Sequence, residues 1–238
     1  MPRPQERAVG TVLGSAVGDA LGAPFEFGPE GAFSARFPAA GQGGEMCGGG
    51  GWDPGEATDD TQMAVLVGES LTDHDALDLP DIFGRFRRWA AADPKDIGLQ
   101  TEAVLTGEDP WDLAAALHFQ VSQRAAGNGA LMRAATSAVY FARQGRDATM
   151  EAGRRIAALT HGDRAAWEGT AIFHELIRVA LDGGDPVTAV PGGLAGAVHG
   201  VGGIPEPWMA ALHVPLPGFG GRVLRAAELV GLARRLAG

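Results

Sequence analysis

The chain has 238 residues, of which 45% are hydrophobic and 20% charged, and 19 Lys and Arg against 29 Asp and Glu give it a formal net charge of −10. This is the composition of a globular chain with room for a substantial core, and an acidic balance without clustered Lys and Arg argues against a nucleic-acid surface. The single cysteine, Cys47, excludes an internal disulfide and suits a reducing compartment, and no run of about 18 apolar residues predicts a membrane span, so we expect a cytoplasmic protein.

The first predicted element is a helix over residues 6–22, in which Val9, Leu13 and other apolar residues recur at helical spacing among small residues that allow close packing. Asp19 falls near its end and Glu26 just beyond it, where the helix dipole disfavours a carboxylate. We therefore expect a metal ion or a ligand hydroxyl to compensate these acids. The alternative is that both are solvated residues of a turn.

A loop rich in glycine and proline over residues 28–55 leads to Thr58-Asp59-Asp60-Thr61, at the start of a helix predicted over residues 60–72. Loops of this length in a compact domain are typically functional lids or disordered. The two carboxylates and two hydroxyls form a cluster of hard oxygen ligands that suits magnesium, manganese or calcium. The alternative is ordinary helix-starting chemistry, which stabilises a helix by roughly 0.5–2 kcal/mol.

Turns rich in Asp, Gly and Pro separate three further helical patterns, over residues 80–92, 97–106 and 112–123. Gly127-Asn128-Gly129 then opens a helix predicted to continue to Phe141. The backbone N–H groups of such a turn favour an anion such as phosphate, and Asn128 suits a ligand hydroxyl. Taken alone, Gly-Asn-Gly is also a common turn, and Arg133 in the first helical turn is a common solvated side chain.

The remaining helices are predicted over residues 147–159, 164–182 and 221–236, and a small-residue segment from Gly192 to Gly200 also has the pattern of a closely packed helix. His161 lies in the connection Thr160-His161-Gly162-Asp163, near a helix end that favours its protonated form; a capping histidine is the alternative. Alternating β-branched runs are absent. The sequence therefore predicts an all-α fold, a compact multi-helix single domain.

Five stretches stand in a specific order and separation. They are Gly14-x-x-x-Gly18-Asp19-Ala20-Leu21-Gly22-x-Pro24-x-Glu26, Thr58-Asp59-Asp60-Thr61, Gly127-Asn128-Gly129-x-x-Met132-Arg133, Thr160-His161, and the tail from Gly192 to Trp208. Together they resemble the ADP-ribosylglycohydrolase family, and the match covers most of the chain as one domain over residues 1–238.

The resemblance implies a hydrolase that cleaves the N- or O-glycosidic bond between ADP-ribose and a protein or a small molecule, at a dinuclear magnesium or manganese centre. Its partners would be an ADP-ribosylated protein or a small ADP-ribose-containing ligand. By position, Thr58, Asp59 and Asp60 would ligate metal, and Glu26, Asp59 and Asp60 would be catalytic. The substrate-binding residues would be Asp19, Gly127, Asn128, Gly129, Met132, Arg133 and His161.

The chain departs from the family at its second acidic metal motif, Gly-Gly-Asp-Ser/Thr-Asp-Ser/Thr, because residues 182–191 contain no Asp-x-Asp. Gly183-Gly184-Asp185, with Thr188, is either a shortened remnant or the natural end of the preceding helix, followed by an internal deletion near residues 185–192. We favour the deletion, because the tail resumes the family pattern abruptly at Gly192. One metal ion or none would then bind, and the alternative function is a catalytically impaired ADP-ribose-binding pseudoenzyme.

A third hypothesis is an enzyme that acts on a prenyl diphosphate through Asp59 and Asp60. That chemistry usually needs a further acid one helical turn on, where Met63 and Ala64 stand instead. We therefore disfavour it.

Overall fold

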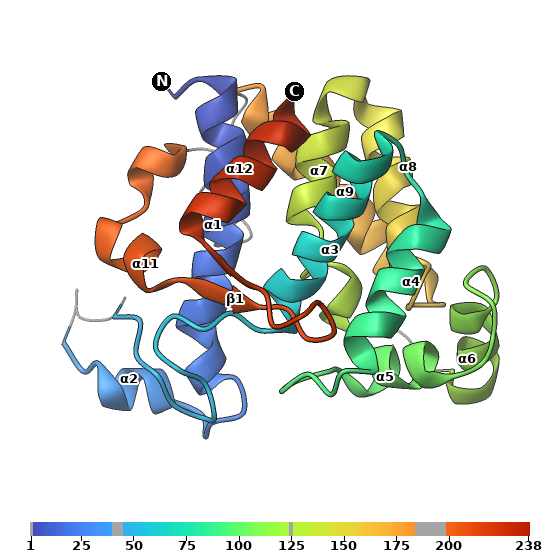
Figure 1. The fold of residues 1–238 in the computed structure, drawn as a ribbon, viewed down its shortest axis with the longest axis horizontal. Helices are drawn as coiled ribbons and strands as arrows, with labels where there is room; N and C mark the ends of the chain where they lie inside the picture. The colour runs from blue at the N-terminus through green and yellow to red at the C-terminus, as the bar shows by residue number, and fades with distance from the viewer. Residues whose placement is uncertain (1, 40–44, 124–125, 184–198) are drawn as a thin grey trace.

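The computed structural model describes residues 2–39, 45–123, 126–183 and 199–238, and its fold is built from helices (Figure 1). The α-helices are α1 (Pro4–Gly22), α2 (Ala32–Arg36), α3 (Asp59–His74), α4 (Leu79–Ala90), α5 (Leu99–Thr106), α6 (Ala114–Ser122), α7 (Ala135–Phe141), α8 (Arg146–Ala157), α9 (Arg164–Leu181), α11 (Glu206–Ala211) and α12 (Ala226–Ala237). Short 3₁₀ helices are η1 (Ala23–Phe25), η2 (Asn128–Ala130), η3 (Ala142–Gln144) and η4 (Val201–Gly203). In the described part of the chain, the regular strands are β1 (His213–Pro215) and β2 (Val223–Arg225), which form one antiparallel pair. The predicted all-α fold class is confirmed.

Helix α3 lies at the centre of the molecule, because it is buried on nearly all sides. Its side chains Met63, Leu66 and Leu71 are fully buried in one continuous core. It packs against α1, α4, α7 and α12, and Figure 1 shows these helices lying close around it. The core therefore fixes the position of the N-terminal end of α3, where Thr58 caps the helix by accepting a hydrogen bond from the Asp60 amide.

Two helix predictions are wrong at their starts. The helix expected from Gly127 to Phe141 is interrupted, because the Leu131 and Met132 amides both donate to the Asn128 carbonyl in a 3₁₀ turn and α7 begins only at Ala135. The last helix begins at Ala226 instead of residue 221, because the preceding residues pair with β1 as β2. The deletion predicted near residues 185–192, with Asp185 and Thr188, lies outside the described residues.

Helix α1, with the η1 turn that follows it, is long and apolar enough to cross a membrane by length and composition. Of the most apolar stretch of 18 residues in this segment, 61% is buried inside the structure. Leu13 and Ala16 are fully buried against neighbouring helices, among them α12, α7 and α3. Packing in the core therefore accounts for the apolar composition of this helix.

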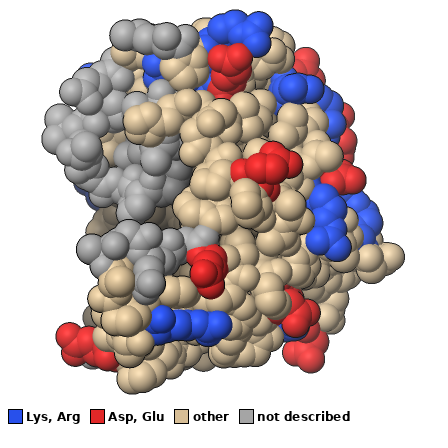
Figure 2. Space-filling view, turned by 90° about the vertical axis from the view of Figure 1, so that its left-hand side faces the viewer, with Lys and Arg blue, Asp and Glu red and all other residues tan. Residues whose placement is uncertain are grey.

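The face of the molecule shown in Figure 2 carries Lys and Arg side chains interspersed with Asp and Glu. Among the described residues on this face, the positive side chains do not gather into one large patch. This distribution agrees with the acidic composition of the chain.

Gly55 lies in the segment that leads into α3 and packs closely against Ala211, so we expect Gly55→Ala to destabilise the fold. Its φ of +81° is unfavourable for any side chain, and an added Cβ would lie 2.3 Å from the Ala211 carbonyl oxygen. We expect the free energy of unfolding to fall by roughly 2–4 kcal/mol. Urea denaturation measures it, with Gly84→Ala as the matched control: Gly84 lies inside α4 with nothing within 4 Å of an added Cβ, so alanine there should stabilise by about 0.5–1 kcal/mol. Equal stability of the two variants would contradict the prediction.

Candidate functional site

A cavity of about 940 Å³ lies where the C-terminal end of α1 meets the start of α3, the segment before α5 and the η2 turn. Most of the predicted site residues line it together: Asp19, Glu26, Thr58, Asp59, Asp60, Gly127, Asn128, Gly129, Met132 and His161. Arg133 is the exception, because its side chain is fully buried behind the wall. These predicted residues, from four separate parts of the sequence, thus meet at one place.

Asp19 joins α1 to the start of α3. Its Oδ1 accepts the Thr58 hydroxyl at 2.8 Å, and its Oδ2 accepts the Thr58 amide at 3.0 Å and the Thr61 amide and hydroxyl at 3.2 and 2.6 Å. Burial raises the pKa of Asp19, and the donors of Thr61 and Thr58 oppose that shift. The compensation that the sequence led us to expect from a metal or ligand is therefore supplied in large part by the N-terminus of α3, where backbone amides favour a carboxylate.

We expect Asp19→Ala to lower the free energy of unfolding by about 2–4 kcal/mol, because it leaves the buried donors of Thr58 and Thr61 without an acceptor. Chemical denaturation measures the loss, and Asp109→Ala, at an exposed turn position, is the control that should change stability little. A loss no larger than that of the control would show that this network does not hold α1 to α3.

Asp59 and Asp60 carry the strongest electrostatic perturbation in the cavity. Burial, followed by the charges of Asp96, Asp19 and Glu26, raises the pKa of Asp59 to about 7. Burial, followed by the charges of Asp19 and Asp59, raises the pKa of Asp60 to about 8. Among the described residues, no Lys or Arg side chain forms an ion pair with either carboxylate. Each acid disfavours ionisation of the next, and the charge of the buried Arg133, which interacts with Asp59, leaves both pKa values raised.

The donor set fits a divalent cation. Thr58 donates its hydroxyl hydrogen to Asp19, which leaves a lone pair of its oxygen for a metal, and the Asp59 and Asp60 carboxylates are the hard ligands that Mg²⁺ and Mn²⁺ prefer. A bound cation would also offset the burial and the repulsion that together raise the two pKa values. Thr58, Asp59 and Asp60 are thus the residues that would hold such an ion.

Several residues on the cavity wall were not predicted from the sequence. Asp96 faces the acidic group closely enough to raise the pKa of Asp59 and Glu26, and Gly98, Gln100 and Thr101 follow it on the same wall. Asp96 belongs to the turn before α5, where the sequence indicated only a break between two helices. Phe27 and Leu99 also line the cavity and are 75% and 85% exposed, so they stand at its mouth.

A second group of possible ligands lies outside this cavity. Ligand atoms of Asp53, Glu56 and His213 lie within 4.8 Å of one another, the only such set found among the described residues. However, Glu56 Oε2 already accepts from Lys95 Nζ at 2.8 Å and from the Asp53 amide at 2.9 Å. Because a lysine already neutralises its one buried acid, this cluster is a poorer cation site than Asp59 and Asp60, which form no ion pair with the described residues.

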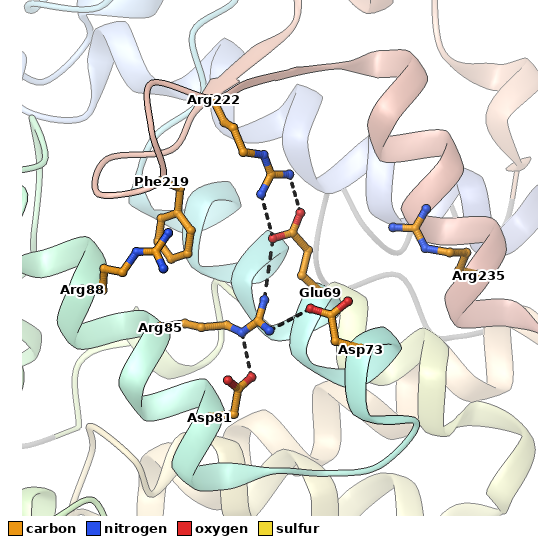
Figure 3. Close-up of a pocket in the computed structure, with 8 residues that line it drawn as sticks. All are labelled: Glu69, Asp73, Asp81, Arg85, Arg88, Phe219, Arg222 and Arg235. Atoms are coloured by element: carbon orange, nitrogen blue, oxygen red, sulfur yellow. Dashed lines mark hydrogen bonds and ion pairs between the residues drawn. The ribbon is translucent and has the colours of Figure 1, made fainter.

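A smaller cavity of about 400 Å³ lies between α3, α4 and the β1–β2 loop, and charged side chains line it (Figure 3). Glu69 Oε1 accepts from Arg222 at 2.6 Å, and Arg85 donates to Asp81 and Asp73 at 2.7 and 2.8 Å. Arg88 lies over the Phe219 ring, with its guanidinium carbon 3.9 Å from the ring centre. These contacts fasten the loop to the two helices, so we regard this cavity as structural.

The fold and the larger cavity thus define an all-helical protein with a carboxylate-lined ligand site suited to a divalent cation. A family model described as ADP-ribosylglycohydrolase matches residues 1–191. The chain therefore belongs to the ADP-ribosylglycohydrolase family, as its motifs predicted.

Individual relatives agree with this assignment. The chain is 36% identical over 141 residues to an ADP-ribosyl-[dinitrogen reductase] glycohydrolase of Rhodospirillum rubrum, a match that covers 58% of this chain and 46% of that protein. It is 24% identical to ADP-ribosylarginine hydrolase Tri1 of Serratia proteamaculans (strain 568), over 87% of this chain and 75% of that protein. The chain thus spans about half the length of the first relative. The second alignment runs over 286 positions, more than this chain contains, so parts of that relative have no counterpart here.

A solved structure titled "ADP-ribosylglycohydrolase-related protein complex" superposes with a TM-score of 0.72 at 26% identity. The superposition covers 100% of this chain and 99% of that chain. The match therefore extends over essentially the whole of both chains.

Proposed function

We propose that the protein hydrolyses the glycosidic bond of an ADP-ribosylated protein or small molecule and releases ADP-ribose, with Mg²⁺ or Mn²⁺ held by Thr58, Asp59 and Asp60. The observation that carries the proposal is the pair of carboxylates of Asp59 and Asp60, both with raised pKa values, which lines the larger cavity together with Glu26. The names of both relatives, which describe hydrolases of ADP-ribose linkages, support it. The reducing compartment that a single cysteine suits would be the cytoplasm.

Different residues of the cavity would serve different steps of the reaction. Cleavage at the anomeric carbon develops positive charge on the ribose, which the carboxylates of Asp59 and Asp60 would stabilise. Burial and the charges of Asp96 and Asp19 raise the pKa of Glu26, which suits a group that takes up or gives a proton near the reacting water. A bound divalent cation would supply Lewis acidity and lower the pKa of water.

The other wall of the cavity would bind the remainder of the ligand. Gly127, Asn128 and Gly129 bring backbone and amide groups to it, and His161 lies directly behind the two glycines. Met132 lines the same wall. We assign the ribose hydroxyls and the diphosphate to this side, because no carboxylate among the described residues lies on it.

The test is release of ADP-ribose from synthetic peptides ADP-ribosylated on arginine or on serine, followed by chromatography. We expect release from at least one peptide above the rate without enzyme, and the ratio between the two identifies the acceptor. No release from either peptide or from a small ADP-ribosylated acceptor, by folded protein supplied with both metals, would overturn the hydrolase proposal.

A second candidate function is an ADP-ribose-binding pseudoenzyme, favoured by the absence of an Asp-x-Asp between Asp182 and Pro191. It predicts ADP-ribose binding that needs no metal and is not followed by turnover. Calorimetry with ADP-ribose in a chelator distinguishes the two candidates. Binding without release supports the pseudoenzyme, and the absence of any binding heat counts against it.

A further inference from the structure

Arg133 is a fully buried cation whose hydrogen bonds within the described residues do not include a carboxylate, although its charge interacts with that of Asp59. One terminal nitrogen donates to the Thr160 hydroxyl at 2.7 Å and to the Ile156 carbonyl at 3.2 Å. The other lies 3.9 Å from the Met63 sulfur, and Nε lacks a hydrogen-bond partner among the described residues. The guanidinium carbon also lies 4.8 Å from the centre of the Phe86 ring. Burying a guanidinium without hydrogen bonds to a carboxylate costs free energy, which indicates that Arg133 has a role beyond packing.

The Thr160 hydroxyl connects Arg133 to His161 through hydrogen bonds. Its hydroxyl oxygen is buried and lies 2.8 Å from His161 Nδ1. A guanidinium only donates, so Thr160 accepts from Arg133 and must place its own hydrogen elsewhere. Among the described residues, Nδ1 is the acceptor within reach. If Nδ1 carried the hydrogen instead, the threonine oxygen would receive two donors and its hydrogen would lack an acceptor.

The opposite side of the imidazole faces the cavity. A Cβ added to Gly129 would lie only 3.1 Å from His161 Cε1 and 3.3 Å from Nε2, so a side chain there would crowd the ring, and one added to Gly127 would lie in ordinary contact with Nε2 at 3.5 Å. Among the described residues, Nε2 has no hydrogen-bond partner. Burial, followed by the charges of Arg133 and His118, lowers the pKa of His161 to about 3, so the ring is neutral at physiological pH.

We propose that Arg133 is a positioning residue that acts through Thr160 to hold His161 in the Nε2–H tautomer. The imidazole then presents a fixed hydrogen-bond donor to an oxygen acceptor bound beside the Gly127–Gly129 turn. That this oxygen belongs to ADP-ribose rests on the function proposed above, whereas the tautomer does not. Arg133 thus acts on the ligand from behind the wall, without touching it.

The tautomer is read directly from ¹⁵N chemical shifts of protein labelled with [¹⁵N]histidine, with the His161 signals assigned by their loss in His161→Gln. We expect the Nε2–H form in the unmodified protein. Thr160→Val removes the relay at nearly constant volume and should shift the tautomer ratio toward Nδ1–H by about tenfold. Thr160→Ser keeps the hydroxyl and should restore the original ratio. An Nδ1–H form in the unmodified protein, or a ratio unchanged by Thr160→Val, would overturn the proposal.

Arg133→Met provides a second variant, because replacing a buried charge by an apolar side chain of similar size often leaves the fold intact. It should also move the ratio toward Nδ1–H, and an unchanged ratio would equally count against the relay. Calorimetry with ADP-ribose then measures the consequence, about tenfold weaker binding by Thr160→Val and nearly normal binding by Thr160→Ser. Unmodified protein that shows the Nε2–H form but does not bind ADP-ribose would refute the proposed ligand and leave the relay confirmed.

Discussion

Asp59→Asn should reduce the rate of ADP-ribose release by about 10³-fold or more while leaving the helical circular dichroism intact. The substitution removes a negative charge and a hard ligand from the wall on which the reacting ribose would lie, and electrostatic stabilisation of this kind usually contributes most to catalysis. Because the pKa of Asp59 is raised to about 7 by burial and by neighbouring acids, its amide should be tolerated by the fold. Initial rates at saturating Mn²⁺ measure the effect.

The matched control is Asp53→Asn, which changes the same chemical group outside the cavity. Asp53 is exposed and belongs to the cluster with Glu56 and His213, so this variant also tests whether that cluster is the metal centre. We expect its rate to stay within about threefold of the unmodified protein. A large loss in Asp53→Asn with normal turnover by Asp59→Asn would move the site away from the start of α3.

The second large effect is on stability as a function of pH. The folded-state pKa values of Asp59 and Asp60, about 7 and about 8, lie above the ordinary aspartate value of 3.8, so the folded protein binds more protons than the unfolded chain between these limits. The free energy of unfolding must then fall as pH rises from about 4 to 8. We expect these two groups to contribute a fall of about 2–4 kcal/mol, less than the separate shifts imply because the carboxylates share their repulsion.

Urea denaturation in a chelator at pH 5 and pH 8 measures this fall, and Asp60→Asn isolates the contribution of one carboxylate. The variant should be more stable than the unmodified protein at pH 8 and nearly equal to it at pH 5. Added Mn²⁺ should stabilise the unmodified protein more at pH 8 than at pH 5, because protons compete with the metal for the same oxygens. Parallel stability curves for the two proteins would show that Asp60 is not buried in an acidic cluster.

Much of the fold was predictable because its helices carry strong local signals. The helices predicted over residues 80–92 and 164–182, from apolar spacing and from the turns between them, correspond to α4 and α9 within a few residues. The helix predicted from Gly127 failed because a tertiary arrangement, the approach of the turn to His161, determines its backbone. The β1–β2 pair escaped prediction because three-residue strands are too short to show alternation.

For the site, the motifs predicted which residues meet but not how they are held. Asp19 looked like an uncompensated acid, because the sequence does not reveal that Thr58 and Thr61 turn four donors toward it. Arg133 looked like a wall residue, because helical spacing does not show which side of a broken helix is buried. Asp96 carried no pattern at all, since a single acid in a turn resembles any other until the fold places it near Asp59.

The most direct test of the central claim compares ADP-ribose release from an ADP-ribosylated arginine peptide in excess chelator with release after Mg²⁺ or Mn²⁺ is restored. We expect no release in chelator, full recovery with metal, and no recovery in Asp59→Asn. Release that persists in chelator at the same rate would contradict the account, because the carboxylates at the start of α3 would then work without the cation that their charge requires.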